Sequence, residues 1–342
     1  MTLTTALALA GALLLLVLAL HGWWSTRRAR PRKATDVPAV AERVEPALGG
    51  AEPDAAPPEP VTLRTAPRRV PRLDALIDAI VPLALDAPIS GEMALLHLPP
   101  TRRAGSKPFY IEGLTTESGH WEPCAPGQRY GELQAGVQLA SRSGALNEIE
   151  FSEFVQKVEG FAEAVGARAD VPDMLEVAAR ARELDAMTSP LDAQLTITLR
   201  SNGVAWSVGY VQQAAARLGF VAGAVPGRLV LPAAEEGAPP VLVLSVDPQA
   251  VLADDPQAAA VRECMLVLDV AQTPESAEPF PAFHRAATTL AGDLDATPID
   301  GQGQAITLHA YAAIGTELQQ LYRQLGALDL VAGSAAARRL FS

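Results

Sequence analysis

The chain has few cysteines, histidines and aromatic residues, and these shortages limit its chemistry. Its two cysteines, Cys124 and Cys264, are far apart and form no CxxC pair, so neither a disulfide framework nor a structural zinc site is expected. None of the five histidines stands at ligand spacing from another histidine or cysteine. No metal or other cofactor is therefore expected.

Motifs of catalysis are also absent from the sequence. There is no G-x-S-x-G motif and no P-loop, and Gly301-Gln302-Gly303 is a lone G-x-G of the kind found in hairpin turns. No combination of residues suggests acid–base or nucleophilic catalysis. We expect neither an enzyme nor a small-molecule substrate.

Charge is distributed unevenly along the chain. The first 26 residues carry no charge, whereas the run 27–33 carries five positive charges (Arg27, Arg28, Arg30, Arg32 and Lys33). Because the formal net charge of the whole chain is −12, the remainder is strongly acidic. An acidic body argues against nucleic-acid binding, which needs a cationic surface.

The uncharged N-terminal run predicts a membrane anchor. Residues 3–20 are almost entirely apolar, and extension to Trp24 reaches the ~30 Å of a bilayer core. Trp23 and Trp24 would lie at the interface, followed directly by Arg27 and Arg28. A cleaved signal peptide is the rival interpretation, but it carries its positive charge before the apolar run. The charge here follows the run, which favours an uncleaved single-pass anchor over 1–24, with the N-terminus outside and the C-terminal part cytoplasmic.

Residues 25–72 are expected to form a basic stop-transfer segment and a flexible linker. Nine of the residues from 31 to 72 are proline, which favours an extended, semi-rigid chain without a packed core.

Two rounds of strands and helices follow the linker. In the first, over 73–190, the patterns predict a helix over 72–86 bent at Pro82, a strand over 91–98, a hairpin of 108–115 with 120–124, a strand over 132–141, and helices over 147–166 and 172–187. The apolar stripe of the helix over 147–166 includes Ile149.

The second round covers 191–330, and a tail over 331–342 follows. It is predicted to contain strands over 194–200, 228–232, 241–246 and 263–270, a strand with a turn over 296–306, and helices over 207–218, 281–294 and 308–325. The class expected is α+β, with an antiparallel sheet and helices on one face. The similar order of the two rounds indicates either a tandem duplication or a coincidence of the kind that α+β layers commonly produce.

The anchor also carries a family resemblance. The stretch His21-Gly22-Trp23-Trp24-Ser25-Thr26-Arg27-Arg28 resembles the N-terminus of the ZipA family, bacterial division proteins that anchor FtsZ to the inner membrane. The segment from Ala193 to Leu325 follows the element order of that family's FtsZ-binding domain, including the helix that ends in Gly219-Phe220. Residues 73–190 have no counterpart in the shorter family members.

The resemblance implies a six-stranded antiparallel sheet with helices on one face. It implies that the other face is a shallow apolar groove for the C-terminal peptide of FtsZ. Placed by strand alternation, the groove would include Thr196, Thr198, Val225, Val241, Val243, Met265 and Val267. The first of these strands is polar where the family's groove is apolar. A slip of one residue would instead turn any of these side chains to the core.

The resulting hypothesis is a cell-division adaptor that binds FtsZ and tethers the division ring to the bacterial inner membrane at the septum. The alternative is a membrane-tethered cytoplasmic binding module with a different protein partner that uses the additional region 73–190.

Overall fold

The computed structural model describes residues 72–235, 237–252 and 259–342. The expected anchor over 1–24, its interface residues Trp23, Trp24, Arg27 and Arg28, and nearly all of the expected linker lie outside these residues. Within them, no helix is both long and apolar enough to span a bilayer. The chain is α+β with antiparallel sheets, as predicted, and it divides into an N-terminal unit (72–187) and a C-terminal unit (188–342).

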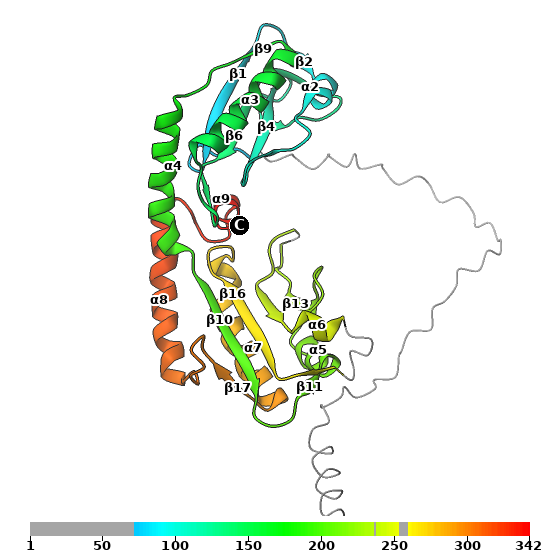
Figure 1. Cartoon of the computed structure of the whole chain (residues 1–342), viewed down its shortest axis with the longest axis vertical. Coiled ribbons are helices and arrows are strands. Elements are labelled where there is room, and N and C mark those ends of the chain that lie inside the picture. The colour runs from blue at the N-terminus through cyan, green and yellow to red at the C-terminus, as the bar shows by residue number, and fades with distance from the viewer. Residues whose placement is uncertain (1–71, 236, 253–258) are drawn as a thin grey trace, which may run out of the picture. The chain divides into compact units, whose positions relative to one another are not determined.

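The N-terminal unit contains one antiparallel sheet with the strand order β3-β4-β6-β1-β9, to which β2 adds on β6 and β5 on β4 (Figure 1). Its strands are β1 (Asp78–Leu85), β2 (Ile89–Ser90), β3 (Arg103–Ala104), β4 (Lys107–Thr115), β5 (Trp121–Pro123), β6 (Arg129–Gln138) and β9 (Ala167–Ala169). A separate hairpin is formed by β7 (Ala140–Ser141) and β8 (Gly144–Ala145). Its helices are α2 (Gly91–His97), α3 (Glu148–Val165) and α4 (Met174–Thr188).

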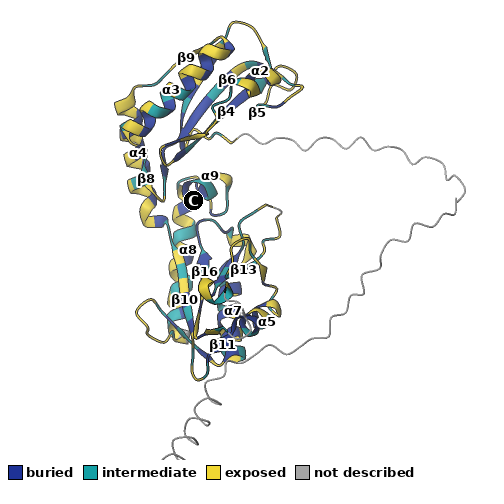
Figure 2. Ribbon diagram, turned by 45° about the vertical axis from the view of Figure 1, so that its right-hand side comes forward, coloured by how far each residue is buried: buried dark blue, intermediate teal, exposed yellow. Residues whose placement is uncertain are grey.

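Helix α3 covers one face of this sheet. The Asn147 side chain caps its first turn in a reciprocal capping box with Glu150, and Gly166 ends it in the left-handed conformation (φ 70°). Phe154 packs edge-on against Phe109 of β4, with 5.4 Å between ring centroids. The buried and exposed sides of α3 are distinct in Figure 2. Only Ile149 departs from the predicted apolar stripe, because it is 82% exposed.

Two predictions in this unit were wrong. The stretch predicted as a helix over 72–86 instead contains strand β1, in which Ala79, Val81 and Leu83 are buried at every second position. The apolar residues of this stretch fit both the helical period and the strand period. The stretch forms a strand because it pairs with β6 on one side and with β9 on the other. The Pro82 side chain is exposed, and its carbonyl accepts a hydrogen bond from the Asp170 amide at 3.0 Å.

The predicted strand over 91–98 is helix α2. Ser90 caps this helix by accepting a hydrogen bond from the Met93 amide at 3.2 Å. Gly91 lies directly against the backbone of Ala125, where an added Cβ would stand 1.7 Å from the carbonyl oxygen. The serine cap and the glycine contact therefore fix the start of a helix where a strand was predicted.

The C-terminal unit has a six-stranded antiparallel sheet with the order β12-β13-β14-β16-β10-β17. Its strands are β10 (Gln194–Ser201), β12 (Val221–Ala222), β13 (Arg228–Leu231), β14 (Leu242–Ser245), β16 (Glu263–Asp269) and β17 (Ala296–Ile299), with β11 (Trp206–Ser207) and β15 (Ala260–Val261) paired separately. Its helices are α5 (Val208–Ala216), α6 (Pro248–Val251), α7 (Pro279–Leu294), α8 (Leu308–Ala327) and α9 (Ala335–Leu340), with short 3-10 turns η1 (Ser189–Leu191) and η2 (Glu275–Ala277). The predicted strands and helices of this round are all present, with ends that differ by a few residues.

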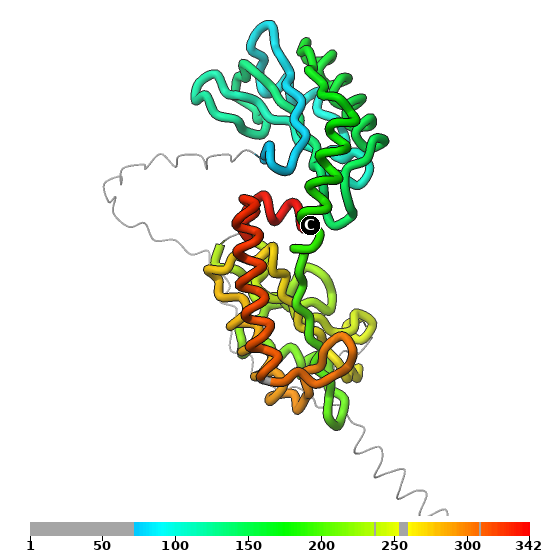
Figure 3. The backbone as a smooth tube through the Cα atoms, turned by 90° about the vertical axis from the view of Figure 1, so that its left-hand side faces the viewer, coloured from blue at the N-terminus to red at the C-terminus, as the bar shows by residue number. Residues whose placement is uncertain are grey.

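One face of this sheet forms the core with α5 and α7. Leu199 on β10, Leu266 on β16 and Leu244 on β14 are fully buried in one cluster with Phe283 and Leu290 of α7. In Figure 1, α7 lies behind β10 and β16. Figure 3 shows α8, in orange to red, along the side of the unit turned to the viewer.

The segment 331–342, expected as a tail, is part of the folded unit. It contains α9, whose residues Ala337 and Leu340 are buried. The Gln272 side chain donates a hydrogen bond to the carbonyl of Phe341 at 2.6 Å. These contacts hold the C-terminal segment beside the end of β16.

The two units share one topology. In each, a first strand (β1 or β10) is followed by a serine-capped helix (α2 or α5), and the first strand later pairs with a long strand (β6 or β16) and a short final strand (β9 or β17). The four-strand order β4-β6-β1-β9 corresponds to β14-β16-β10-β17. In both units the helix before the final strand (α3 or α7) ends in a left-handed residue, Gly166 or Asp295.

Candidate partner-binding face

The C-terminal sheet turns a row of valines away from its helices. Strand register places Thr196 opposite Val267 and Val267 opposite Val243. Val243 lies opposite Val230, which in turn lies opposite Val221. Cross-strand pairs of this kind share a face of the sheet, so these five residues form one row, here called the valine row.

A second row runs beside the valine row. Met265 pairs with Thr198 on one side and with Ser245 on the other, and Ser245 pairs with Arg228. Met265 is 41% exposed. A shallow depression of about 510 Å³ lies here and is lined partly by these four residues and by Val225, which is 49% exposed.

Polar pairs flank the apolar centre of this face. At one end of β10 and β16, Arg200 forms an ion pair with Glu263 at 2.6 Å. At the other end, the Gln194 amide donates to the Asp269 carboxylate at 3.1 Å. Both pairs lie in register across the two strands. On β10 and β16 the two rows thus lie between satisfied polar pairs, an arrangement suited to a peptide with a few apolar anchors.

The structure places six of the seven predicted groove residues on this face: Thr196, Thr198, Val225, Val243, Met265 and Val267. Val241 is not one of them. It precedes the start of β14, is 7% exposed and packs in the core cluster. Val221, Val230 and Arg228 were not predicted, although the alternation in Arg228–Leu231 already separates Val230 from its buried neighbour Leu229.

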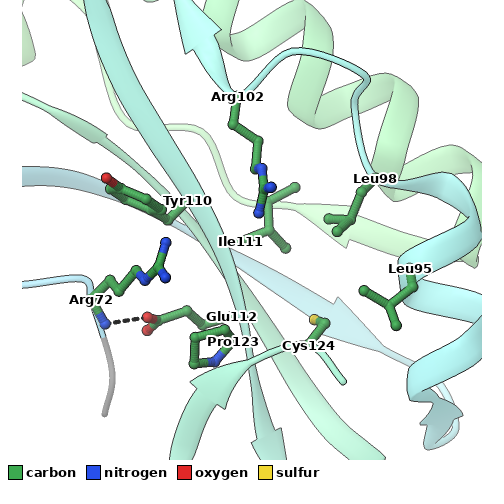
Figure 4. A pocket seen from close by; sticks show the side chains of 9 residues that line it. All are labelled: Arg72, Leu95, Leu98, Arg102, Tyr110, Ile111, Glu112, Pro123 and Cys124. Carbon is green, nitrogen blue, oxygen red and sulfur yellow. Dashed lines mark hydrogen bonds between the residues drawn. The ribbon is translucent and has the colours of Figure 1, made fainter. Parts of the chain in front are cut away.

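In the N-terminal unit the corresponding face is covered by the chain itself. The buried carboxylate of Glu112 on β4 accepts hydrogen bonds from the backbone amides of Arg72 and Leu73, the latter at 3.3 Å (Figure 4). The Gln134 side chain donates to its second oxygen at 3.3 Å. Leu73 fills the space above Gly136, where a Cβ would stand 2.5 Å from a leucine methyl.

A small cavity lies beside this contact, lined in part by Leu95, Leu98, Arg102 and Cys124 (Figure 4). Its volume is about 50 Å³, which leaves room for a few water molecules. Burial raises the pKa of the Cys124 thiol to about 12. The thiol therefore stays protonated near neutral pH and is a poor nucleophile.

Lys107 is a fully buried ionisable group of the same unit. Its ammonium donates to Ser141 Oγ at 2.9 Å, Ser143 Oγ at 3.0 Å and the Gly144 carbonyl at 2.5 Å. Burial lowers the pKa of Lys107. Its three hydrogen bonds fasten the β7–β8 hairpin to β4.

Among the residues that the structure describes, no three His, Cys, Asp or Glu side chains stand close enough to hold a metal ion. No known family model matches this chain, and no curated protein matches its sequence.

Proposed function

We propose that the protein is a membrane-anchored adaptor of bacterial cell division. The sheet of its C-terminal unit binds the C-terminal peptide of FtsZ, and its N-terminal segment holds that contact at the inner membrane. The observation that carries the proposal is the valine row, which stands on the sheet face opposite α5 and α7.

The architecture of the C-terminal unit supports this assignment. A six-stranded antiparallel sheet with α5 and α7 on one face is the arrangement that the ZipA resemblance implies. A peptide on the other face would bury Met265, Val267 and Val243, and the removal of their apolar surface from water would contribute to binding.

The shared topology supports a tandem duplication of one ancestral unit. The contacts on the N-terminal sheet support binding by one copy only. In the N-terminal unit, Glu112 and Gly136 already hold Arg72 and Leu73 on the corresponding face. A peptide there would have to displace this segment, so we assign FtsZ binding to the C-terminal unit alone.

A binding module for a different cytoplasmic partner is the second candidate. It is favoured by the threonines at 196 and 198 and by Arg228, which make part of the face polar. Such a face would suit a partner segment with fewer apolar anchors than the FtsZ peptide.

Titration of the fragment 72–342 with a labelled C-terminal peptide of FtsZ separates the two candidates. We expect saturable binding at or below ~100 μM, which corresponds to roughly 5–6 kcal/mol, and none with a scrambled peptide. Absence of binding at that concentration would exclude the FtsZ adaptor and leave the second candidate.

A further inference from the structure

Helix α2 of the N-terminal unit exposes large apolar side chains. Met93 is 40% exposed and Leu96, three residues further on, is 76% exposed, so the two lie on the same side of the helix. Leu95 is 37% exposed and lines the small cavity together with Leu98 and Arg102 (Figure 4). These residues are close enough in the helix to form an apolar patch, and patches of this kind mark contacts with other molecules.

The shared topology indicates that the fold itself does not require this patch. Helix α5 has the corresponding position in the C-terminal unit, where it follows the first strand and begins at a serine cap. The exposed residues of α5 are Gln212 and Ala216, and its large apolar residues are buried or half-buried. The apolar side chains that α2 exposes therefore point to a contact outside the unit.

The loop that follows α2 adds positive charge beside the patch. Residues 93–111 contain Arg102, Arg103 and Lys107 but no acidic residue, although the chain as a whole is acidic. Lys107 is buried, whereas Arg102 and Arg103 are exposed. The side chain of Arg103 donates a hydrogen bond to the Ser106 carbonyl at 2.5 Å. The exposed part of this segment is thus apolar and cationic.

Carboxylates that border this segment are engaged with backbone amides. Glu150 and Glu153 on α3 accept hydrogen bonds from the amides of residues 105–106, each at 2.8 Å. Glu92 at the start of α2 accepts a hydrogen bond from the Gly127 amide at 2.7 Å. In the part of the chain that the structure describes, neither exposed arginine of the loop forms an ion pair. Both remain available to an anionic ligand.

We propose that residues 93–103, here called the leucine–arginine surface, dock the N-terminal unit on an anionic lipid bilayer. The exposed leucines enter the boundary between headgroups and acyl chains, and the arginines bond to lipid phosphates. A bilayer fits this surface better than a peptide does, because the leucines project from a short helix. The cavity beside them holds about 50 Å³, which is too small for the side chains of a peptide.

This docking rests on the membrane anchor of the proposed function, but not on FtsZ binding. An anchor over 1–24 and a linker over 25–72 would keep the N-terminal unit near the bilayer, which raises its effective concentration there. An apolar patch with two arginines is then sufficient, because each of the two attractions adds to the tether. The N-terminal unit, to which we assign no FtsZ binding, thereby has a role of its own.

The test uses the full chain in lipid nanodiscs. Thr101→Cys carries a thiol-reactive fluorophore, and a small share of the lipids carries a spin-labelled headgroup as quencher. The chain without this substitution gives the background, because burial makes the thiols of Cys124 and Cys264 poorly reactive. We expect roughly threefold stronger quenching with phosphatidylglycerol in the nanodiscs than with phosphatidylcholine alone, and loss of this difference at high salt.

Two substitutions separate docking from folding. Leu96→Ser and Arg102→Gln should each reduce the quenching about twofold, and neither should lower the melting temperature, since both side chains are exposed. The matched controls in the same unit are Leu175→Ser on α4 and Arg168→Gln on β9, which are also exposed. Both controls should leave the quenching unchanged.

Equal quenching in the two lipid compositions, or quenching that neither Leu96→Ser nor Arg102→Gln reduces, would overturn the proposal and point to an acidic protein as the partner. Titration of the same nanodiscs with the FtsZ peptide distinguishes the possible failures. Peptide binding without quenching refutes the docking alone, and quenching without peptide binding refutes the adaptor function alone. A chain that does not enter the nanodiscs refutes the anchor, on which both proposals rest.

Discussion

Val243 and Val267 lie opposite one another on β14 and β16, and Thr196 of β10 stands on the other side of Val267. Val243 and Val267 are therefore the two members of the valine row that lie on the two central strands of the sheet. Both valines are partly exposed, whereas their chain neighbours Leu244 and Leu266 are fully buried. A substitution at Val267 changes the face with little effect on the core.

The first prediction concerns this central position. Val267→Glu should weaken binding of the FtsZ peptide by ~1–3 kcal/mol, because it places a charge among the apolar anchors. Anisotropy titration of the fragment 72–342 measures the change, and thermal unfolding checks that the fold is retained. Loss of folding would mean that Val267 faces the core.

Ala216→Glu is the matched control for that change. Ala216 is exposed at the end of α5, on the helix-covered side of the sheet. The Ala216→Glu substitution adds the same charge away from the valine row. It should therefore leave the peptide affinity within about twofold of the starting value, a difference of roughly 0.4 kcal/mol. Equal weakening by both substitutions would indicate a general charge effect.

The second prediction tests the segment that covers the N-terminal sheet. Glu112→Gln removes the negative charge of the carboxylate that accepts hydrogen bonds from the backbone amides of Arg72 and Leu73. The substitution should destabilise the N-terminal unit by ~1–3 kcal/mol. Denaturant unfolding measures the loss. Glu117→Gln, at an exposed turn position, is the control and should have an effect near zero.

The third prediction uses the two tryptophans of the described chain, Trp121 and Trp206. The buried Trp206 indole donates to the Leu294 carbonyl at 2.8 Å. Trp206→Phe removes this bond and part of the packed volume, which should cost the C-terminal unit ~2–4 kcal/mol. In the fragment 72–342, Trp121 then remains as the fluorescent reporter of the N-terminal unit. The urea midpoint measured by Trp121 fluorescence should be unchanged. The circular dichroism signal should show a first transition at a lower urea concentration, because the C-terminal unit is destabilised. A common shift of both signals would contradict separate unfolding of the units.

The fourth prediction concerns alkaline pH. Burial raises the pKa values of Cys124 and Cys264 to about 12, whereas an unfolded thiol titrates near ~8.5. Above that pH the unfolded state loses protons that the folded state keeps, so the contribution of the thiols to stability is complete below ~8.5 and declines as the pH rises toward 12. We expect a loss on the order of 1–2 kcal/mol per thiol between pH 8 and pH 10, measured by urea unfolding.

Substitution separates the thiols from other groups in this pH range. Cys124→Ala and Cys264→Ala should each reduce the slope of stability against pH by about half, whatever their effect at neutral pH. Burial also raises the pKa values of Tyr130 and Tyr322, but free phenols titrate near ~10. An unchanged slope in both alanine variants would contradict the assignment to the thiols.

Local signals predicted some elements well and others poorly. The helix over 147–166 was placed almost to the residue because Asn147 and Gly166 mark its two ends. For residues 72–98 the two predicted element types were exchanged. A helix was predicted where the structure has strand β1, and a strand where it has helix α2. Short apolar runs fit either period, and β1 is a strand because of its partners β6 and β9, which are distant in sequence.

The candidate face was predictable where strands alternate strictly. Thr196, Val243 and Val267 follow from alternation alone, whereas Val241 lies just outside β14 and is not governed by its pleat. The Glu112 contact was not predictable. It is formed by segments that only the tertiary fold brings together, and no local sequence pattern indicates such a contact.

The position of each unit's first strand has a consequence during protein synthesis. β1 lies between β6 and β9, and β10 lies between β16 and β17, so each is flanked by strands that the ribosome makes much later. Until Arg168 can pair with Ala84, or Pro298 with Leu199, a nascent unit keeps its central strand open to solvent. Exposed strand edges of this kind are prone to mispairing. Because the two units follow one another in the sequence, all strands of the N-terminal unit are synthesised before those of the C-terminal unit. The N-terminal unit can therefore complete its sheet before a strand of the C-terminal unit is present to mispair with it. The order of translation thus protects the correct pairing.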